Sequence, residues 1–136
     1  MKKLFTLMVV VSILLMANIA GADNNITFRW QANTEPDLAR YKLYQTDTSG
    51  DYTKAQVVGE GNLVAIIIVD LSATPPIHPT EYTLNGVVDG EHFWVLTAVD
   101  VSNNESDFSN EVSAILDSTP PDAPTILQIT AIVRNP

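Results

Sequence analysis

The sequence has no cysteine, few basic residues and no clear helical period after its first segment. Without cysteine there is no disulfide and no thiol nucleophile, so the fold must be held by its core alone. Seven lysines and arginines stand against sixteen acidic residues, which gives a formal net charge of −9. A phosphate backbone would be repelled, so we expect no nucleic-acid partner.

The first residues are typical of an export leader. Lys2 and Lys3 form a positive end, residues 4–16 are apolar but too short for a typical membrane span, and 20–22 read Ala-Gly-Ala. We expect cleavage after this motif and a mature chain that begins at Asp23, with an uncleaved anchor as the alternative. The expected location is outside the cytoplasm, either secreted, at the cell surface or in the periplasm.

Short segments of apolar and polar residues, separated by turn residues, predict β-strands. In the first of them, Ile26, Phe28 and Trp30 alternate with polar residues and share one face. Residues 63–69 (LVAIIIV) do not alternate, which indicates either a strand buried on both faces or an edge that pairs with another chain. Such strands without helices predict an all-β sandwich or barrel. The expected strands are 26–30, 40–45, 52–58, 63–69, 81–84, 92–99 and 110–116.

Several stretches, taken in order, resemble a fibronectin type III domain of the bacterial secreted kind. Trp30 matches the tryptophan of the second strand, and residues 37–44 (DLARYKLY) are similar to the third. Residues 82–100 resemble the fifth and sixth strands, and 103–114 resemble the last loop and seventh strand. The resemblance covers residues 26–116 and implies an immunoglobulin-like β-sandwich of about seven strands.

This sequence departs from the family pattern at three places. His92 stands where the family usually has a tyrosine that pins the corner, so the corner is held by an imidazole or is looser. The segment of residues 62–79 is longer than the connection expected between the fourth and fifth strands. The first strand has no counterpart, because only residues 23–25 would precede the tryptophan strand after cleavage.

The polar stretch of residues 98–114 admits two interpretations. It can be the tip of a hairpin, where Asn, Ser and Asp side chains bond to their own backbone. It can instead contribute to a calcium site, since calcium takes about six to eight oxygen ligands. The spacing matches no EF-hand, and no other cofactor is expected. The candidate calcium ligands are Asp100, Asn103, Glu105 and Asp107, with Glu35 and Asp37 at the same pole of the sandwich.

The sequence offers little support for catalysis. The two histidines, His78 and His92, lie among prolines and at the strand corner, and neither belongs to a catalytic motif. The carboxylates lie in predicted turns, with no insertion that would form a pocket apart from residues 62–79. We therefore expect a protein that is not an enzyme.

The aromatic residues fall into two groups by their place in the strand pattern. Trp30 and Trp94 occupy inward positions, so we expect them to pack in the core. Tyr44 and Phe93 face the other way, and Tyr52 lies near an edge. These three are the candidates for an exposed contact with a glycan or protein, the alternative being cross-strand packing.

The C-terminal residues extend beyond the predicted domain, which we place at residues 23–117. Residues 118–124 (STPPDAP) resemble the linker before a further such domain, and 125–133 (TILQITAIV) resemble its first strand. This strand fills the place of the missing first strand, either in another copy or, with a strained linker, in its own chain, or it is the remnant of a second domain. Its apolar residues are Ile126, Leu127, Ile129, Ile132 and Val133.

We expect an exported, non-catalytic module with a binding, adhesion or structural role at the cell surface or in the periplasm. Its partner would be a protein or glycan ligand, and no membrane span would remain after cleavage of the leader. Two other functions are a fibre subunit that self-assembles by C-terminal strand exchange, as a homo-oligomer, and an accessory carbohydrate-binding module. The fold alone does not decide between them.

Overall fold

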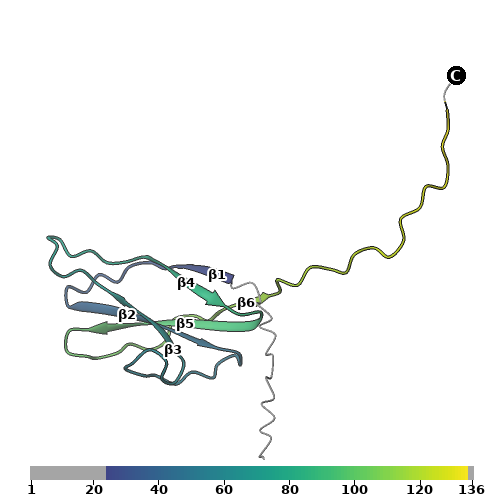
Figure 1. The fold of residues 1–136 in the computed structure, drawn as a ribbon. Helices are drawn as coiled ribbons and strands as arrows, with labels where there is room; N and C mark the ends of the chain where they lie inside the picture. The colour runs from purple at the N-terminus through teal and green to yellow at the C-terminus, as the bar shows by residue number, and fades with distance from the viewer. Residues whose placement is uncertain (1–23, 135–136) are drawn as a thin grey trace, which may run out of the picture.

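The computed structural model describes residues 24–134, which form six β-strands in two antiparallel sheets (Figure 1). The predicted leader, residues 1–22, lies outside the described residues. The first sheet pairs β1 with β4, and the second has the order β3-β2-β5-β6. No helix of the described residues is long and apolar enough to cross a membrane. The strands are β1 (Asn24–Arg29), β2 (Leu38–Thr46), β3 (Leu63–Ile68), β4 (Glu81–Val87), β5 (Gly90–Asp100) and β6 (Val112–Leu116).

The prediction of an all-β fold is confirmed, and the alternation of β1 explains how its sheet packs. Ile26 and Phe28 are half-buried and pack against the core, whereas Thr27 and Arg29 are exposed. On the exposed face, the hydroxyl groups of Thr27 and Thr83 lie 2.8 Å apart across β1 and β4. The pattern of period two therefore places one face of this small sheet on the core and the other in solvent.

The core lies between the two sheets and contains both tryptophans. Trp94 on β5 is fully buried, and its ring meets Phe28 edge-on at a centroid distance of 5.4 Å. Trp30 packs edge-on against Tyr41 at 5.2 Å. These aromatic pairs join the two sheets, because Phe28 and Trp30 come from the β1 side and their partners from β5 and β2. The prediction that both tryptophans pack in the core is confirmed.

The corner between β4 and β5 is held by an imidazole. His92 is buried, and its Nε2 lies 2.9 Å from the carbonyl oxygen of Val88, which fixes the proton on that nitrogen. The other ring nitrogen, Nδ1, lies 3.4 Å from the side-chain nitrogen of Gln45, whose oxygen accepts a hydrogen bond from Trp94 Nε1 at 3.0 Å. A chain of hydrogen bonds thus runs from the buried indole to the corner, where the resembling family has a tyrosine.

Residues 52–58 are not a strand, which corrects the prediction made from the sequence. The place beside β2 is taken by β3, whose residues Leu63, Ala65 and Ile67 are buried. Burial along this segment therefore alternates although all of its residues are apolar, and Ile68 is exposed. Because β3 lies within residues 62–79, that stretch contains a strand of the second sheet and not only an insertion.

Candidate functional site

An apolar groove lies where the two sheets have their open edges. It has a volume of about 120 Å³ and is bounded by the end of β1, by β5 and by the start of β6. Both β1 and β6 are outermost strands of their sheets within the described residues. The groove therefore lies where the end of β1 comes near the start of β6, and a strand that adds to the edge of β1 would pass over it. Its apolar lining comes from Phe28, Trp30, Leu43, Trp94, Val95, Leu96 and Val112.

Within residues 24–134, β1 has a partner strand on one side only. Its partner is β4, and the described residues provide no strand on the other side. Trp30 adds an unused donor at the groove, because its indole Nε1–H is buried and has no hydrogen-bond partner among the described residues. A buried donor without a partner costs about 1–3 kcal/mol. Backbone hydrogen bonds as well as apolar contacts would therefore contribute to the affinity for an incoming strand.

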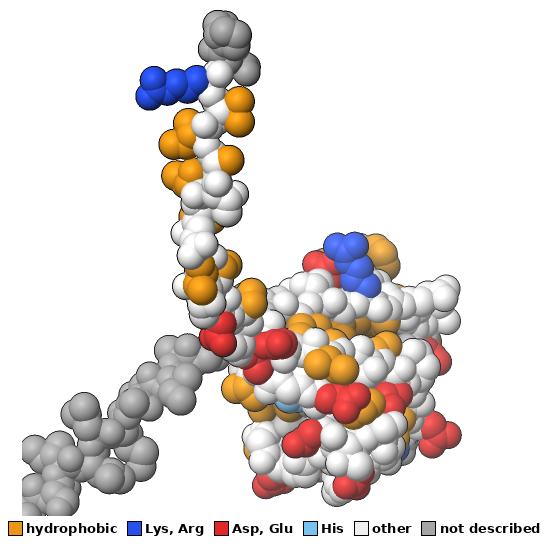
Figure 2. Space-filling view, turned by 90° about the vertical axis from the view of Figure 1, so that its right-hand side faces the viewer, with side chains coloured by type: hydrophobic (Ala, Val, Ile, Leu, Met, Phe, Trp, Pro, Cys, Tyr) orange, Lys and Arg blue, Asp and Glu red, His pale blue; other side chains and the backbone are white. Residues whose placement is uncertain are grey.

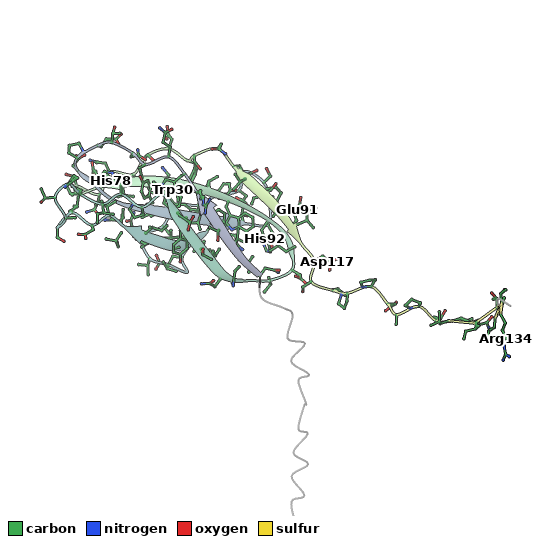
Figure 3. The ribbon with its side chains drawn as sticks, turned by 90° about the horizontal axis from the view of Figure 1, so that it is seen from above. Trp30, His78, Glu91, His92, Asp117 and Arg134 are labelled. Atoms are coloured by element: carbon green, nitrogen blue, oxygen red, sulfur yellow. The ribbon has the colours of Figure 1, made fainter. Side chains whose placement is uncertain are left out.

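The C-terminal segment is extended and free of the module. Residues 125–133 form no strand in the single chain, so the extra strand expected there stays a prediction. The apolar side chains of this segment stand in solvent, with Leu127 99% and Ile129 83% exposed. Figure 2 shows these hydrophobic side chains along the tail, and Figure 3 shows it running from Asp117 to Arg134. We call residues 118–134 the tail.

Asp89, in the turn between β4 and β5, ties the start of β1 to the start of the tail. One carboxylate oxygen accepts a hydrogen bond from Asn24 Nδ2 at 3.1 Å. The other accepts from the backbone N–H and the hydroxyl of Ser118, at 3.1 and 2.6 Å. The bonds from Ser118 lower the pKa of Asp89 below its ordinary value, with a further contribution from Asn24. The tail therefore leaves the module beside the first residue of β1.

Asp89→Ala is expected to loosen the exit of the tail. The backbone N–H of Ser118 loses its acceptor, so its hydrogen exchange should become faster while the core amides keep their protection. The measurement is residue-resolved amide exchange by NMR. Glu91→Ala is the matched control, because Glu91 is an exposed carboxylate on β5 next to the same corner. Equal exchange at Ser118 in both variants would contradict the role given to Asp89.

The six candidate calcium ligands are only partly brought together. Glu35, Asp37, Asp100 and Glu105 line one polar hollow of about 270 Å³ at the pole where β2 begins and β5 ends. The remaining two, Asn103 and Asp107, do not line it. Within residues 24–134, no group of three or more histidine and acidic side chains is placed to hold a metal ion. Calcium binding stays a prediction, which equilibrium dialysis at millimolar calcium would test.

The loop after β5 is the hairpin tip that one of the two interpretations proposed. Asp100 accepts hydrogen bonds from the backbone N–H groups of Ser102 and Asn104, both at 2.8 Å, and from the Asn104 side chain at 2.7 Å. These bonds, with those from Asn104 as the largest cause, lower the pKa of Asp100. Asn103 takes a positive φ of 66°, which asparagine tolerates better than most residues. Its side-chain oxygen accepts a hydrogen bond from Arg40 at 2.6 Å.

Glu105 points inward from this loop and forms a buried ion pair with Lys42. The two side chains are 9% and 1% exposed, and Lys42 Nζ lies 2.9 Å from Glu105 Oε2. The ammonium also donates to the Ala55 carbonyl at 2.7 Å and to Gln56 Oε1 at 3.1 Å. The other oxygen of Glu105 accepts hydrogen bonds from the hydroxyls of Tyr44 and Thr97. Each charge is thus fully hydrogen-bonded, as a buried pair requires.

This pair fastens two loops over the outer face of the four-stranded sheet. Tyr44, Leu63 and Val95 form a second buried cluster there, covered by residues of the loops 47–62 and 101–111. The Phe108 ring lies 5.5 Å from the ring of Tyr44 and the same distance from that of Tyr52. The module therefore has an apolar layer outside the sheet as well as the core between the sheets.

The buried carboxylate is expected to make stability fall in acid. Burial raises the pKa of Glu105, but the hydrogen bonds from Tyr44, Lys42 and Thr97 outweigh it and hold the pKa below 4.5. The unfolded chain then takes up a proton first, so the free energy of unfolding decreases as pH falls through the lowered pKa. Urea unfolding between neutral pH and about pH 3 measures this slope. Glu105→Gln should flatten the curve, and an unchanged slope would contradict the assignment.

The three aromatic residues proposed for an exposed contact do not form one surface. Tyr44 is fully buried, because the two loops cover the face that the strand pattern left to solvent, so its prediction as an exposed residue is wrong. Burial and the bond to Glu105 raise the pKa of its hydroxyl well above the usual range. Tyr52 and Phe93 are half-buried, and the Tyr52 hydroxyl donates to Glu111 at 2.8 Å.

Comparisons with known proteins provide no family for this chain. No model of a known protein family matches it, and no curated protein or solved structure does so.

Proposed function

We propose that the chain is an exported, non-catalytic module of the fibronectin type III kind whose β1 edge binds an extended polypeptide segment. The strand pairing supports the family resemblance. In immunoglobulin-like sandwiches the second and fifth strands share a sheet with the first. Here β1 and β4, which resemble the second and fifth strands, form a sheet of two. This pairing supports the proposal of such a domain with the place of its first strand open.

The groove beside β1 is the observation that carries the proposal. It combines apolar walls, an unpaired backbone edge and the unused donor of Trp30. An extended peptide that adds to a sheet edge gains affinity from backbone hydrogen bonds and specificity from alternate side chains. A strand that adds to β1 would use the backbone edge, the apolar walls and the donor of Trp30 together, so the groove fits an extended peptide best.

The proposed location follows from the predicted leader, so the bound segment would belong to a protein outside the cytoplasm. The chain is strongly acidic, with a net charge of −9, whereas the groove lining includes one charged residue, Arg29. Affinity would therefore come from burial and backbone pairing more than from charge. A carbohydrate-binding surface is disfavoured, because Tyr44 is buried and the Tyr52 hydroxyl donates to Glu111.

The experiment is to titrate a peptide of residues 122–134 into the mature chain whose own tail is disabled by Leu127→Asp with Ile129→Asp. Both positions are exposed in the single chain, so the module should fold unchanged. We expect NMR shifts at residues 28–30, at Ser109, Asn110 and Val112, and at the indole N–H of Trp30, which lie at the groove. A peptide that carries the same two aspartates is the control. No shift with the unmodified peptide, or shifts spread over both faces, would overturn the proposal.

A further inference from the structure

We infer that the segment that fills the groove is residues 125–133 of a second copy, so that modules join head to tail. This inference rests on the proposed function and names its ligand. Three observations on the described residues carry it: the side-chain pattern of the tail, the place where the tail leaves the module, and the charge of the two surfaces.

The tail has the pattern of a strand with one buried face. Successive side chains of a strand point to opposite faces. In residues 125–133, one face has Thr125 at its start and is apolar from there on, with Leu127, Ile129, Ala131 and Val133. The other face is mixed, because Gln128 and Thr130 lie between Ile126 and Ile132. This is the counterpart of β1, where Ile26 and Phe28 face the core and Thr27 faces solvent.

The place where the tail leaves the module favours a second copy over the tail's own groove. Asp89 holds Ser118 beside the first residue of β1, so a strand antiparallel to β1 would have to begin at the far end, near Trp30. The linker of residues 118–124 has seven residues and spans at most about 23 Å. The six residues of β1 already span about 20 Å. A return within one chain would need the whole linker fully extended, whereas a neighbouring module needs no return.

The tail avoids the repulsion that two acidic copies would otherwise meet. Residues 125–133 contain no charged side chain, although the whole chain carries a net charge of −9. Contact through this segment keeps the carboxylate-rich surfaces of the two modules apart by the length of the linker. The remaining repulsion is screened by salt, so added salt should favour assembly.

The test compares three forms of the mature chain, residues 23–136, by gel filtration with light scattering over a range of concentrations. The unmodified chain is expected to form species of several chains whose size grows with concentration and salt. Leu127→Asp with Ile129→Asp places two charges on the apolar face of the tail and should give a single chain at every concentration. Gln128→Asp with Thr130→Asp places the same two charges on the other face and should still assemble.

The outcomes separate this inference from the proposed function. A single chain for the unmodified protein, together with binding of the peptide of residues 122–134, would overturn the head-to-tail inference and leave the strand-binding module standing. Loss of assembly in both charged variants would also overturn it, because association would then follow the overall apolar character of the tail. Chains of the Leu127→Asp, Ile129→Asp variant retain the groove, so adding them to the unmodified protein should shorten its assemblies.

Discussion

Lys42→Met is expected to lower the free energy of unfolding by about 3 kcal/mol, because it leaves a buried carboxylate without its cation. Glu105 would keep the hydroxyls of Tyr44 and Thr97, but the loop that carries Ala55 would lose its bond to the ammonium. The two loops on the outer face of the sheet should then loosen together. Urea unfolding, followed by fluorescence of the tryptophans, measures the change as a shift of the midpoint.

The control for this effect is an ion pair in solvent. Arg29 and Glu81 pair across β1 and β4 with side chains 80% and 50% exposed, so Arg29→Met should cost less than about 1 kcal/mol. Adding Glu105→Gln to Lys42→Met removes the stranded charge and keeps an acceptor for both hydroxyls, so the double variant should be more stable than Lys42→Met alone. A double variant that is less stable would show that the charge of Glu105 is not what Lys42 compensates.

Trp94→Phe is expected to destabilise the module by about 3 kcal/mol or more, because it removes buried volume and a hydrogen-bond donor together. The indole is 1% exposed and donates to Gln45, whose nitrogen lies against His92. Phenylalanine would leave a cavity in the core and a buried amide oxygen without its partner. Thermal and urea unfolding both report the loss, which should be accompanied by faster exchange at the β4–β5 corner.

Trp30→Phe is the matched substitution at the groove. Its indole N–H is buried without a partner among the described residues, so Trp30→Phe deletes no hydrogen bond and relieves that unpaired donor. The net cost should therefore be less than about 1 kcal/mol, from lost packing on Tyr41. If the two substitutions destabilised the module equally, the hydrogen-bond chain from Trp94 to His92 would not contribute to stability. The difference between the two costs therefore reports the hydrogen-bond chain together with the deeper burial of Trp94.

A strand could be predicted from the sequence where apolar and polar residues alternate and the apolar ones face the core. Ile26, Phe28 and Trp30 alternate cleanly, and the segment becomes β1. The prediction of a strand at residues 52–58 was wrong. The segment 63–68 has more β-branched residues and occupies the edge of β2 in its place. Residues 52–58 are held in place by a tertiary contact instead of strand pairing, because Lys42 on β2 donates a hydrogen bond to the Ala55 carbonyl.

The burial of Lys42 and Glu105 could not be predicted from the sequence. Alternation indicates which residues share a face of a strand, but not whether loops distant in sequence cover that face. Lys42 lies 63 positions from Glu105, and the outer face looked open to solvent. Only the abundance of turn residues around Glu105 was visible, and that pattern is equally typical of a solvated loop. The role of His92 at the β4–β5 corner was easier to predict. It stands where fibronectin type III domains, which the sequence resembles, usually have the tyrosine that pins the corner.

The two loops that cover the sheet also decide where the chain can accept inserted sequence. Hairpin tips are usually the first choice for an epitope tag or a fluorophore, since exposed loops tolerate insertions. Here an insertion in residues 101–111 would displace Glu105 and Phe108, and one in residues 47–62 would displace Ala55 and Tyr52. Residues 71–76 are mostly exposed and lie outside both clusters, so they are the site for a label that leaves the module intact.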